Sequence, residues 1–496
     1  MSIQTLFPRL LLPFCCILLL PLLSVAQPAP DTFEDQTQLP AGLRGQHIQA
    51  LLQAANSNDP GQIRQFFEQH VAEQFRLAMP MEAHIGAFQD AHRTTGGVDF
   101  YSVRTYNPAR PKTVVIVQDR LFGGYSGVTM IFDGPEDRIA ELNFSPARTP
   151  KAALTASPAL SEAELLRTIH EKLEMLCKKD AFSGTVLIAR GDQVLLERAC
   201  GEASKSWHMA NTIDTKFNLG SMNKMFTSTA VAQLAEKGRL RLDDPISKYV
   251  DTTWLPRSIT DRVTVHHLLT HTSGLGSYFN DAYFKSSRDL FRQLDDYKPL
   301  VKGNTLEFTP GSRFGYSNTG MLLLGVVIEK ASGANYFDYI RQNIYQPAGM
   351  TRSDCYELDQ PQENLAEGYV PQAGGQWKNN LFLHVLKGGP AGGGYSTVRD
   401  LHRFARALQT GKLVEPASLE KMWTSHSEAG YGYGFNVEQT PAGKAVGHGG
   451  GFPGLNSHLD LLLDKGYIIV VMSNHDSGAE ALRAYLRNLI FTRLKS

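Results

Sequence analysis

The sequence predicts an α+β fold, in which an antiparallel sheet flanked by helices carries a helical lobe and a small α+β domain precedes it. Two patterns support this prediction. Over residues 43–144, apolar residues first recur at helical spacing and then alternate in four short runs, as in helices followed by a sheet. Further along, a helix and two strands come first, a helical stretch over 240–420 follows, and strands with a closing helix come last. We therefore expect the two ends of this second part to form one sheet.

Length and composition narrow the classes of function. At 496 residues the chain is long enough for two or three domains, and its 42% hydrophobic and 20% charged residues are typical of globular proteins. The 49 basic residues are balanced by 49 acidic ones. A nucleic-acid or membrane-surface binder usually has a basic excess, so we expect neither kind of partner.

The N-terminus has the pattern of an export signal. Arg9 precedes an apolar run over 10–23, and Ser24-Val25-Ala26 is a cleavage site of small residues. The alternative is an uncleaved anchor helix, but the run is shorter than the ~20 residues of a membrane span. We predict a signal peptide at 1–26, no membrane span after its removal, and export to the bacterial periplasm or the extracellular space. The Pro- and Gln-rich segment 27–40 is predicted to be disordered.

Three cysteines remain after this cleavage: Cys177, Cys200 and Cys355. An odd number does not make a complete disulfide framework. Cys177 and Cys200 are able to pair in an oxidising compartment, but the count favours three small, buried, apolar residues. None of the three has the sequence context of a catalytic thiol.

Residues 41–148 are predicted to form the small α+β domain. A helical pattern over 43–75 is broken at 56–61 by Asn-Ser-Asn-Asp-Pro-Gly. The order of elements is similar to that of nuclear transport factor 2-like domains. No catalytic constellation is present, so we expect an accessory or packing role. The four predicted strands cover 99–106, 112–117, 126–132 and 138–144.

A Pro- and Ala-rich linker at 149–161 leads to the second domain at 162–496. The expected cleft between its sheet and its helical lobe is the natural ligand site. Its predicted elements are a helix at 162–176, a hairpin of 185–190 and 193–198 around Gly191-Asp192, strands at 432–437 and 467–472, and a helix at 479–494.

The second domain is organised around Ser221 and Lys224. The residues that follow have helical periodicity, so Lys224 lies one turn beyond Ser221 on the same helix face. A serine hydroxyl is a weak nucleophile until a base takes its proton, and a lysine with a depressed pKa can be that base. The start of the helix also offers free backbone N–H groups to an oxyanion.

Two further polar residues lie at a predicted loop-to-helix junction. Tyr316 is a candidate general base, because a nearby lysine cation lowers the pKa of a phenol, and Asn318 can hydrogen-bond a substrate amide. The alternative is a turn with an Asn helix cap.

A glycine-rich segment supplies the remaining candidates. His448, Gly449 and Gly450 can contact a substrate, and the backbone N–H of Gly451 can be the second oxyanion donor beside that of Ser221. The alternative is a flexible loop. His267 and His271 are four residues apart, but no Glu completes a His-Glu-x-x-His motif, so we expect a structural turn and no metal.

The order of five segments resembles the serine β-lactamase-related family, which includes class C β-lactamases, D-Ala-D-Ala carboxypeptidases, D-aminopeptidases and esterases. The resemblance covers residues 162–494 and implies a β-lactamase/transpeptidase-like fold. The segments are Ser-x-x-Lys at 221–224, Leu-Leu-Thr-His-Thr-Ser-Gly-Leu at 268–275, Pro-Gly-x-x-Phe-x-Tyr-Ser-Asn at 310–318, Gly-Pro-Ala-Gly-Gly-Gly-Tyr-Ser-Thr at 389–397 and His-Gly-Gly at 448–450.

The resemblance implies that Ser221 is the acylated nucleophile, Lys224 its base or charge partner, and Tyr316 a general acid or base. His448-Gly449-Gly450 takes the place of the family's Lys-Thr-Gly. That exchange removes a cation and a hydroxyl that hold a substrate carboxylate. Which group deprotonates the serine stays open.

We therefore predict a secreted serine hydrolase that cleaves an ester or amide of a small molecule or peptide through an acyl-enzyme on Ser221. No cofactor is implied. Two alternatives stay open. One is a penicillin-recognising β-lactamase or D,D-peptidase, and the other is a non-catalytic module that binds peptide or cell wall.

Overall fold

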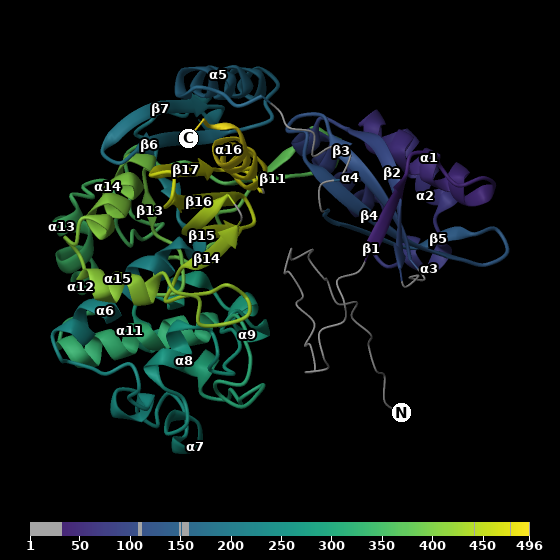
Figure 1. Ribbon diagram of the computed structural model, residues 1–496. Coiled ribbons are helices and arrows are strands. Elements are labelled where there is room, and N and C mark those ends of the chain that lie inside the picture. Colours follow the sequence, from purple (N-terminus) through teal and green to yellow (C-terminus); the bar gives the residue numbers. More distant parts are fainter. Residues whose placement is uncertain are drawn as a thin grey trace, which may run out of the picture.

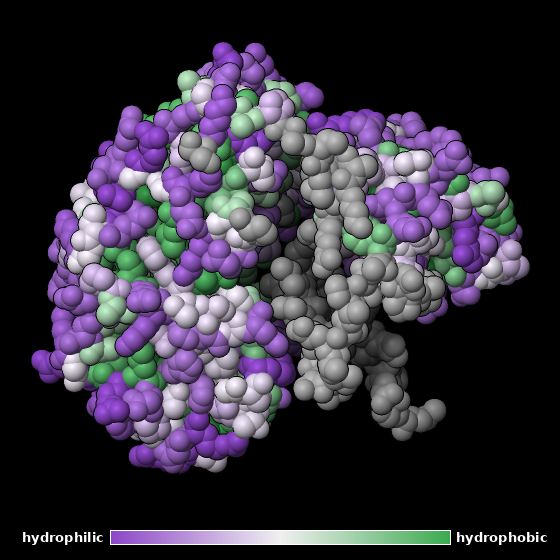
Figure 2. All heavy atoms as spheres, in the orientation of Figure 1, coloured by the Kyte–Doolittle hydropathy of each residue, from purple (hydrophilic) through white to green (hydrophobic). Residues whose placement is uncertain are grey.

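The computed structural model describes residues 32–107, 112–147, 150, 158–440, 442–476 and 478–495. The predicted signal peptide and most of the predicted linker lie outside these residues. An N-terminal region (32–146) and a larger C-terminal region (158–495) are visible as two bodies in Figure 1. On the face drawn in Figure 2, polar side chains dominate and hydrophobic ones form small groups. None of the helices in the described ranges is long and apolar enough to cross a membrane.

The N-terminal region is a five-stranded antiparallel sheet, in the order β1-β2-β3-β4-β5, packed against helices. Its core joins Ile48, Phe67 and Ile85 of the helices to Val115 and Met130 of the strands. The elements are β1 (Thr32–Gln36), α1 (Leu43–Ser57), α2 (Pro60–His70), α3 (Glu73–Arg76), α4 (Met81–Thr95), β2 (Val98–Asn107), β3 (Thr113–Asp119), β4 (Tyr125–Asp133) and β5 (Arg138–Pro146).

Two elements of this region were not predicted. Part of the segment predicted to be disordered, residues 32–36, forms β1 and pairs with β2, where Asp35 accepts two hydrogen bonds from Arg104 at 2.8 and 2.9 Å. The prediction failed there because a strand with one apolar residue is stabilised by its neighbour and not by its own composition. The second element is α4, whose His84 and His92 hydrogen-bond the backbone carbonyls of Arg76 and Ala55.

The C-terminal region contains a six-stranded antiparallel sheet in the order β14-β15-β16-β17-β6-β7. The predicted union of the two chain ends is confirmed, because β6 pairs with β17 from Gly184 opposite Ser473 to Arg190 opposite Tyr467. The strands are β6 (Gly184–Arg190), β7 (Gln193–Cys200), β14 (Asn436–Thr440), β15 (Gly443–Phe452), β16 (Leu455–Leu462) and β17 (Tyr467–Ser473).

Helices cover both faces of this sheet. Alternation along β6 sends Ile188 into the core under α5 (Glu162–Lys178) and α16 (Glu480–Arg493), and sends Leu187 into the core shared with the helical lobe. That lobe is built mainly of α6 (Asn223–Glu236), α7 (Arg257–Thr260), α8 (Val265–Leu269), α9 (Asp281–Lys285), α10 (Lys298–Val301), α11 (Asn318–Ser332), α12 (Tyr336–Ile340), α13 (Gln346–Ala348), α14 (Val398–Gln409) and α15 (Pro416–Met422).

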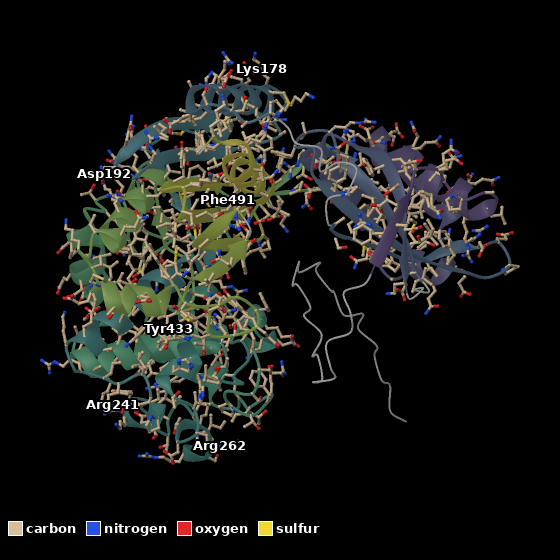
Figure 3. All side chains as sticks on the ribbon, viewed as in Figure 1. Lys178, Asp192, Arg241, Arg262, Tyr433 and Phe491 are labelled. Carbon is tan, nitrogen blue, oxygen red and sulfur yellow. A yellow bond between two sulfur atoms is a disulfide. The ribbon has the colours of Figure 1, made fainter. Side chains whose placement is uncertain are left out.

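The strand predicted at 432–437 begins later, at Asn436. Gly434 has a φ of 74° and packs against the backbone of α6, where a Cβ atom would lie 2.7 Å from the Lys224 carbonyl oxygen. This close approach interrupts the strand pattern. Tyr433, labelled in Figure 3 where the sheet meets the helical lobe, has its hydroxyl 3.0 Å from His266 Nδ1.

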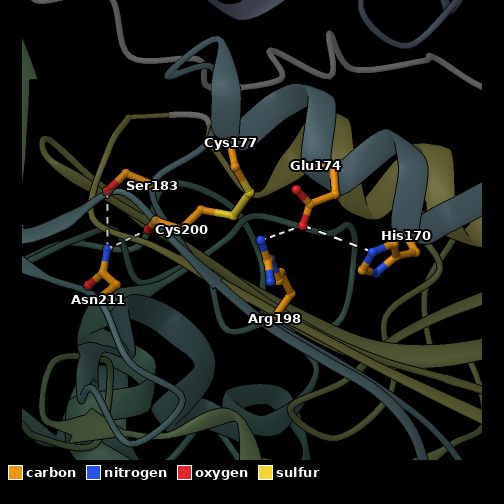
Figure 4. The surroundings of a disulfide bond; sticks show 7 residues. All are labelled: His170, Glu174, Cys177, Ser183, Arg198, Cys200 and Asn211. Atoms are coloured by element: carbon orange, nitrogen blue, oxygen red, sulfur yellow. Dashed lines mark hydrogen bonds and ion pairs between the residues drawn. A yellow bond between two sulfur atoms is a disulfide. The ribbon is translucent and has the colours of Figure 1, made fainter.

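Cys177 and Cys200 form a disulfide, which corrects the prediction of three unpaired cysteines. The end of α5 lies over the end of β7, so the two Cα atoms are 5.4 Å apart, within the normal range for a bridge (Figure 4). Beside it, Glu174 of α5 also pairs with Arg198 of β7. The odd count arose because the third residue, Cys355, is buried and free.

The C-terminal region starts before residue 162. Leu160 forms a parallel bridge with Leu494, and Ser161 caps α5 in a capping box with Glu164. These contacts place the last two residues of the predicted linker in the fold.

The two regions touch along two edges. Leu121 and Phe122, in the turn between β3 and β4, pack with α5 and α16. On the other edge, the guanidinium of Arg93 in α4 lies 5.2 Å from the ring centre of Trp377. Trp377 belongs to a two-stranded hairpin of β11 (Tyr369–Pro371) and β12 (Trp377–Asn379).

Candidate active site

Ser221 lies in a short 3₁₀ turn, η2 (Gly220–Met222), that leads directly into α6. The turn follows β10 (Phe217–Asn218), which pairs with β13 (Tyr395–Ser396). Gly220 has a φ of 49°, and a Cβ atom there would lie 3.1 Å from the backbone of Gly450 and Gly451. Glycine in the serine turn, at 220, and in β15, at 450, therefore lets the two backbones lie directly against each other.

Lys224, in the first turn of α6, is fully buried. Its Nζ lies 3.0 Å from Ser221 Oγ and 2.9 Å from Asn318 Oδ1, and it also donates to the backbone carbonyl of Ala391. All three partners are neutral oxygens. Burial without a carboxylate among these partners holds the pKa of Lys224 well below its usual value. The contact predicted from helical spacing is therefore present.

Tyr316 and Asn318 reach the same place from the start of α11. The Lys224 Nζ lies 4.8 Å from the centre of the Tyr316 ring, which is 42% exposed. Asn318 donates from Nδ2 to Ser277 Oγ at 3.2 Å while its Oδ1 faces Lys224. The helix is capped by Ser317, whose Oγ accepts from the Gly320 N–H, so the side chain of Asn318 is not needed as a cap and can bond Lys224.

The glycines of β15 approach the serine turn closely. A Cβ atom on Gly450 would lie 1.9 Å from the Leu219 carbonyl oxygen and 3.1 Å from the Ser221 nitrogen. The backbones of residues 220–221 and 450–451 are thus in contact. This is the arrangement that two neighbouring N–H donors of an oxyanion hole require.

His448 is buried, and both of its ring nitrogens have partners inside the protein. Nδ1 lies 2.6 Å from the Gly449 carbonyl oxygen, which only accepts, so Nδ1 carries the proton and Nε2 accepts from the Tyr431 hydroxyl at 3.0 Å. Burial lowers the pKa of His448 to about 3. The imidazole is therefore neutral near pH 7. Gly449 has no side chain, and a Cβ atom added there would lie 2.4 Å from the His458 ring. Residues 448 and 449 therefore supply neither a cation nor a hydroxyl to a substrate.

His271 lies behind the site in the structural turn that we expected there from the sequence. It is fully buried with a φ of 56°, and its Nδ1 accepts from the Ser317 N–H at 3.2 Å. Its ring lies 4.4 Å from that of Tyr316 and 4.7 Å from that of Tyr431. Among the residues that the structure describes, no group of three His, Cys, Asp or Glu side chains is placed to hold a metal.

Several of these partners were not found by sequence reasoning. Ser277, Ala391 and Tyr431 come from loops, and Ala391 contributes only a backbone carbonyl, which no residue type reveals. The segment around Ala391 was noted only as part of a motif. Its place over the lysine depends on the fold.

Comparison with known proteins agrees with this geometry. The family model described as Beta-lactamase matches residues 165–491, so the chain belongs to the beta-lactamase family, whose members are serine hydrolases. Penicillin-binding protein 4* of Bacillus subtilis is 30% identical over 335 residues, which are 63% of this chain and 73% of that protein.

Two solved structures are similar in fold and sequence. The penicillin-binding protein from Bacillus halodurans has 34% identity and a TM-score of 0.60, and the match covers 65% of this chain and 98% of the other. The D-stereospecific amidohydrolase from Streptomyces sp. has 25% identity and a TM-score of 0.54, over 64% of this chain and 97% of the other. These matches cover about two thirds of this chain.

Proposed function

We propose that the protein is an exported serine hydrolase that cleaves an ester or amide through an acyl-enzyme on Ser221. The observation that carries the proposal is the fully buried Lys224 amine, which contacts the serine hydroxyl and otherwise only neutral oxygens. An amine kept neutral by burial can accept a proton at neutral pH.

The hydrogen bonds of Lys224 support its role as the base. A neutral amine has two N–H bonds and one lone pair. The carbonyl oxygens of Asn318 and Ala391 accept only, so they take the two N–H bonds and leave the lone pair for the Ser221 hydroxyl. Tyr316 is placed beside the same amine and is the alternative base.

The proposed reaction has two halves. Ser221 Oγ attacks the substrate carbonyl carbon as its proton passes to Lys224, and the N–H groups of Ser221 and Gly451 stabilise the oxyanion. The leaving group takes a proton by way of Tyr316 and departs, which leaves the acyl group on Ser221. Water, deprotonated by the same groups, then breaks the acyl-oxygen bond and restores the hydroxyl.

We also propose that the enzyme acts outside the cytoplasm. The charged, apolar and small-residue pattern of residues 1–26 supports export, and the Cys177–Cys200 disulfide fits an oxidising compartment.

A second candidate function is penicillin recognition. The named relatives at 30% and 34% identity favour it, whereas the neutral His448 at the position of a carboxylate-binding lysine disfavours it. Covalent labelling of the purified protein by a fluorescent penicillin distinguishes the two functions.

The test of the acyl-enzyme uses Ser221→Ala with Ser332→Ala, in the last turn of α11, as the matched control. Wild type and control are expected to hydrolyse p-nitrophenyl esters and to be labelled by a fluorophosphonate probe. Ser221→Ala is expected to lose both. Labelling retained in Ser221→Ala would refute the assignment.

A further inference from the structure

Aromatic rings from both halves of the C-terminal region meet beside the proposed oxyanion hole. Phe279 follows Ser277, whose hydroxyl accepts from Asn318, by two residues. Phe452 directly follows Gly451. The ring centres of Phe279 and Phe452 are 6.1 Å apart, so a ring of the helical lobe and a ring of the sheet are in contact.

Two more rings extend this contact. Phe284 stacks on Phe279 at 6.4 Å, and His384 stacks on Phe452 at 6.1 Å. We call Phe279, Phe284, Phe452 and His384 the aromatic wall. Phe284 is 44% exposed, and Phe279 and Phe452 are half-buried, so three phenyl rings present apolar surface to solvent. A contiguous exposed apolar surface next to a reactive group is typical of a ligand site.

The wall is held from behind. The buried rings of Tyr278 and Tyr283 lie 4.4 and 5.0 Å from the ring of Phe279. Their packing fixes the phenyl group before any ligand arrives. A surface ordered in advance costs less conformational entropy when it binds.

The wall and its surroundings suit an uncharged group. Burial lowers the pKa of His384 to about 4, so its imidazole is neutral near pH 7, like that of His448. On the Phe279 side, a Cβ atom added to Gly276 would lie 2.5 Å from Glu307 Oε1, so a carboxylate already occupies the edge of that loop. A substrate carboxylate would meet this negative charge without a fixed cation at position 448.

The position of the wall along β15 decides which part of a substrate it meets. Tyr316, which serves the leaving group, is linked through the rings of His271 and Tyr431 to His448. Phe452 lies four residues further along β15, or about 13 Å in an extended strand. The leaving group therefore departs at the His448 end, and the acyl group extends toward the wall.

We propose that the aromatic wall is an acyl-binding subsite that selects an uncharged, aromatic or branched apolar acyl group. The proposal rests on acyl transfer at Ser221. It names the substrate class as esters or amides of neutral, apolar acids, in preference to those whose acyl group carries a carboxylate.

The test keeps the leaving group constant and varies the acyl group. The substrates are p-nitrophenyl acetate, 3-phenylpropionate and hemisuccinate, and the variants are Phe279→Ala and Phe452→Ala. Trp207→Ala is the matched control, because Trp207 is an aromatic residue that is 78% exposed in the turn between β8 (Glu202–Ser204) and β9 (Met209–Ala210).

In wild type, kcat/KM for the 3-phenylpropionate is expected to exceed that for the acetate and for the hemisuccinate by about 10-fold or more. Each wall variant is expected to lose about 10-fold on the 3-phenylpropionate and about twofold or less on the acetate. Phe279→Leu should recover part of the loss, and Trp207→Ala should match wild type.

Two results would overturn the subsite. One is an equal loss on acetate and 3-phenylpropionate in the wall variants, and the other is a wild-type preference for the hemisuccinate. Fluorophosphonate labelling separates this failure from that of the proposed function. A labelled Ser221 without acyl selectivity refutes the subsite alone, whereas an unlabelled wild-type protein refutes the hydrolase. The wild-type substrate series decides the question even if an alanine variant does not fold.

Discussion

The two regions of the protein each bury a basic side chain, and they treat it in opposite ways. Arg104, in the N-terminal sheet, is 4% exposed, donates two hydrogen bonds to the carboxylate of Asp35, and lies 3.9 Å from the ring centre of Phe33. Lys224, in the C-terminal region, is fully buried and donates to neutral oxygens.

This difference separates structural burial from functional burial. A cation paired with a carboxylate keeps its charge, and the pair holds β1 against β2. An amine with only neutral partners is destabilised in its charged form and becomes a base. Burial alone does not mark a site. The chemistry of the partners does.

The largest effect is expected from Lys224→Met, which keeps the volume of the side chain and removes the amine. We expect kcat/KM for p-nitrophenyl esters to fall about 10³-fold, since general-base catalysis is usually worth about 10²–10⁴-fold. Stability to urea should be unchanged or higher, because a desolvated amine is lost from the core. Activity within tenfold of wild type would show that Lys224 is not the base.

The opposite result, a loss of stability with activity retained, is expected from Arg104→Met. Removing one partner of a buried ion pair leaves Asp35 uncompensated and costs about 3–5 kcal/mol in free energy of unfolding. Urea unfolding should show this loss in the transition of the N-terminal region. Below the denaturant concentration of that transition, ester hydrolysis should stay within about twofold of wild type. A large loss of kcat/KM in the folded variant would break the contrast.

A smaller and pH-dependent effect is expected from His448. Its pKa is about 3 in the folded protein and about 6.5 when unfolded, so between these values only the unfolded chain binds the proton. Stability is therefore lost as the pH falls below 6.5, by about 2 kcal/mol at pH 5 from this residue. His448→Gln removes the titrating group, so its urea stability should fall less between pH 7.5 and pH 5 than that of wild type.

His84 of the N-terminal region is the matched control for this measurement. It is also buried, and burial also lowers its pKa, but by less than burial lowers that of His448. His84→Gln should therefore change the pH dependence of stability less than His448→Gln does. An equal or larger change would mean that the histidines of the two regions do not differ in this way.

The contrast also explains how much the sequence could predict. The approach of Lys224 to Ser221 follows from helical spacing, and the shared sheet follows from strands at the two ends of the second domain, so both were predicted. Tyr316 and Asn318 were found through a motif that keeps its order along the chain. Each of these signals is a local pattern, or an order of local patterns, that can be read along the chain.

What could not be predicted depends on contacts between distant segments. The Ala391 carbonyl lies 167 residues from Lys224 in sequence, and β1 is held by a partner strand and not by its own pattern. The disulfide needed the end of α5 to lie over the end of β7, and nothing in the spacing of three cysteines reveals that packing. Such contacts are properties of the assembled fold.

The smallest effect is expected from Arg93→Ala at the contact between the two regions. The substitution removes the cation–π contact with Trp377, worth about 0.5–1 kcal/mol, and an ion pair with Asp90 at 2.6 Å, so the loss of stability should be about 1–2 kcal/mol. Because none of the described contacts of Ser221, Lys224, Tyr316 and Asn318 comes from residues 32–107 or 112–147, kcat/KM should stay within about twofold of wild type. Arg64→Ala, which removes an exposed ion pair with Glu82 within the same region, is the control.

The contact nevertheless offers a route by which the two regions would be coupled. Trp377 stacks at 4.4 Å on the buried His475, and the neighbouring Asp476 accepts from the Gly454 N–H in the turn that ends β15. β15 also holds the proposed oxyanion donor Gly451. A tenfold or larger fall in kcat/KM for Arg93→Ala, with unchanged stability and a normal Arg64→Ala control, would show that the N-terminal region positions this strand. The accessory region would then be part of the catalytic machinery, and the separation between the two regions would no longer hold.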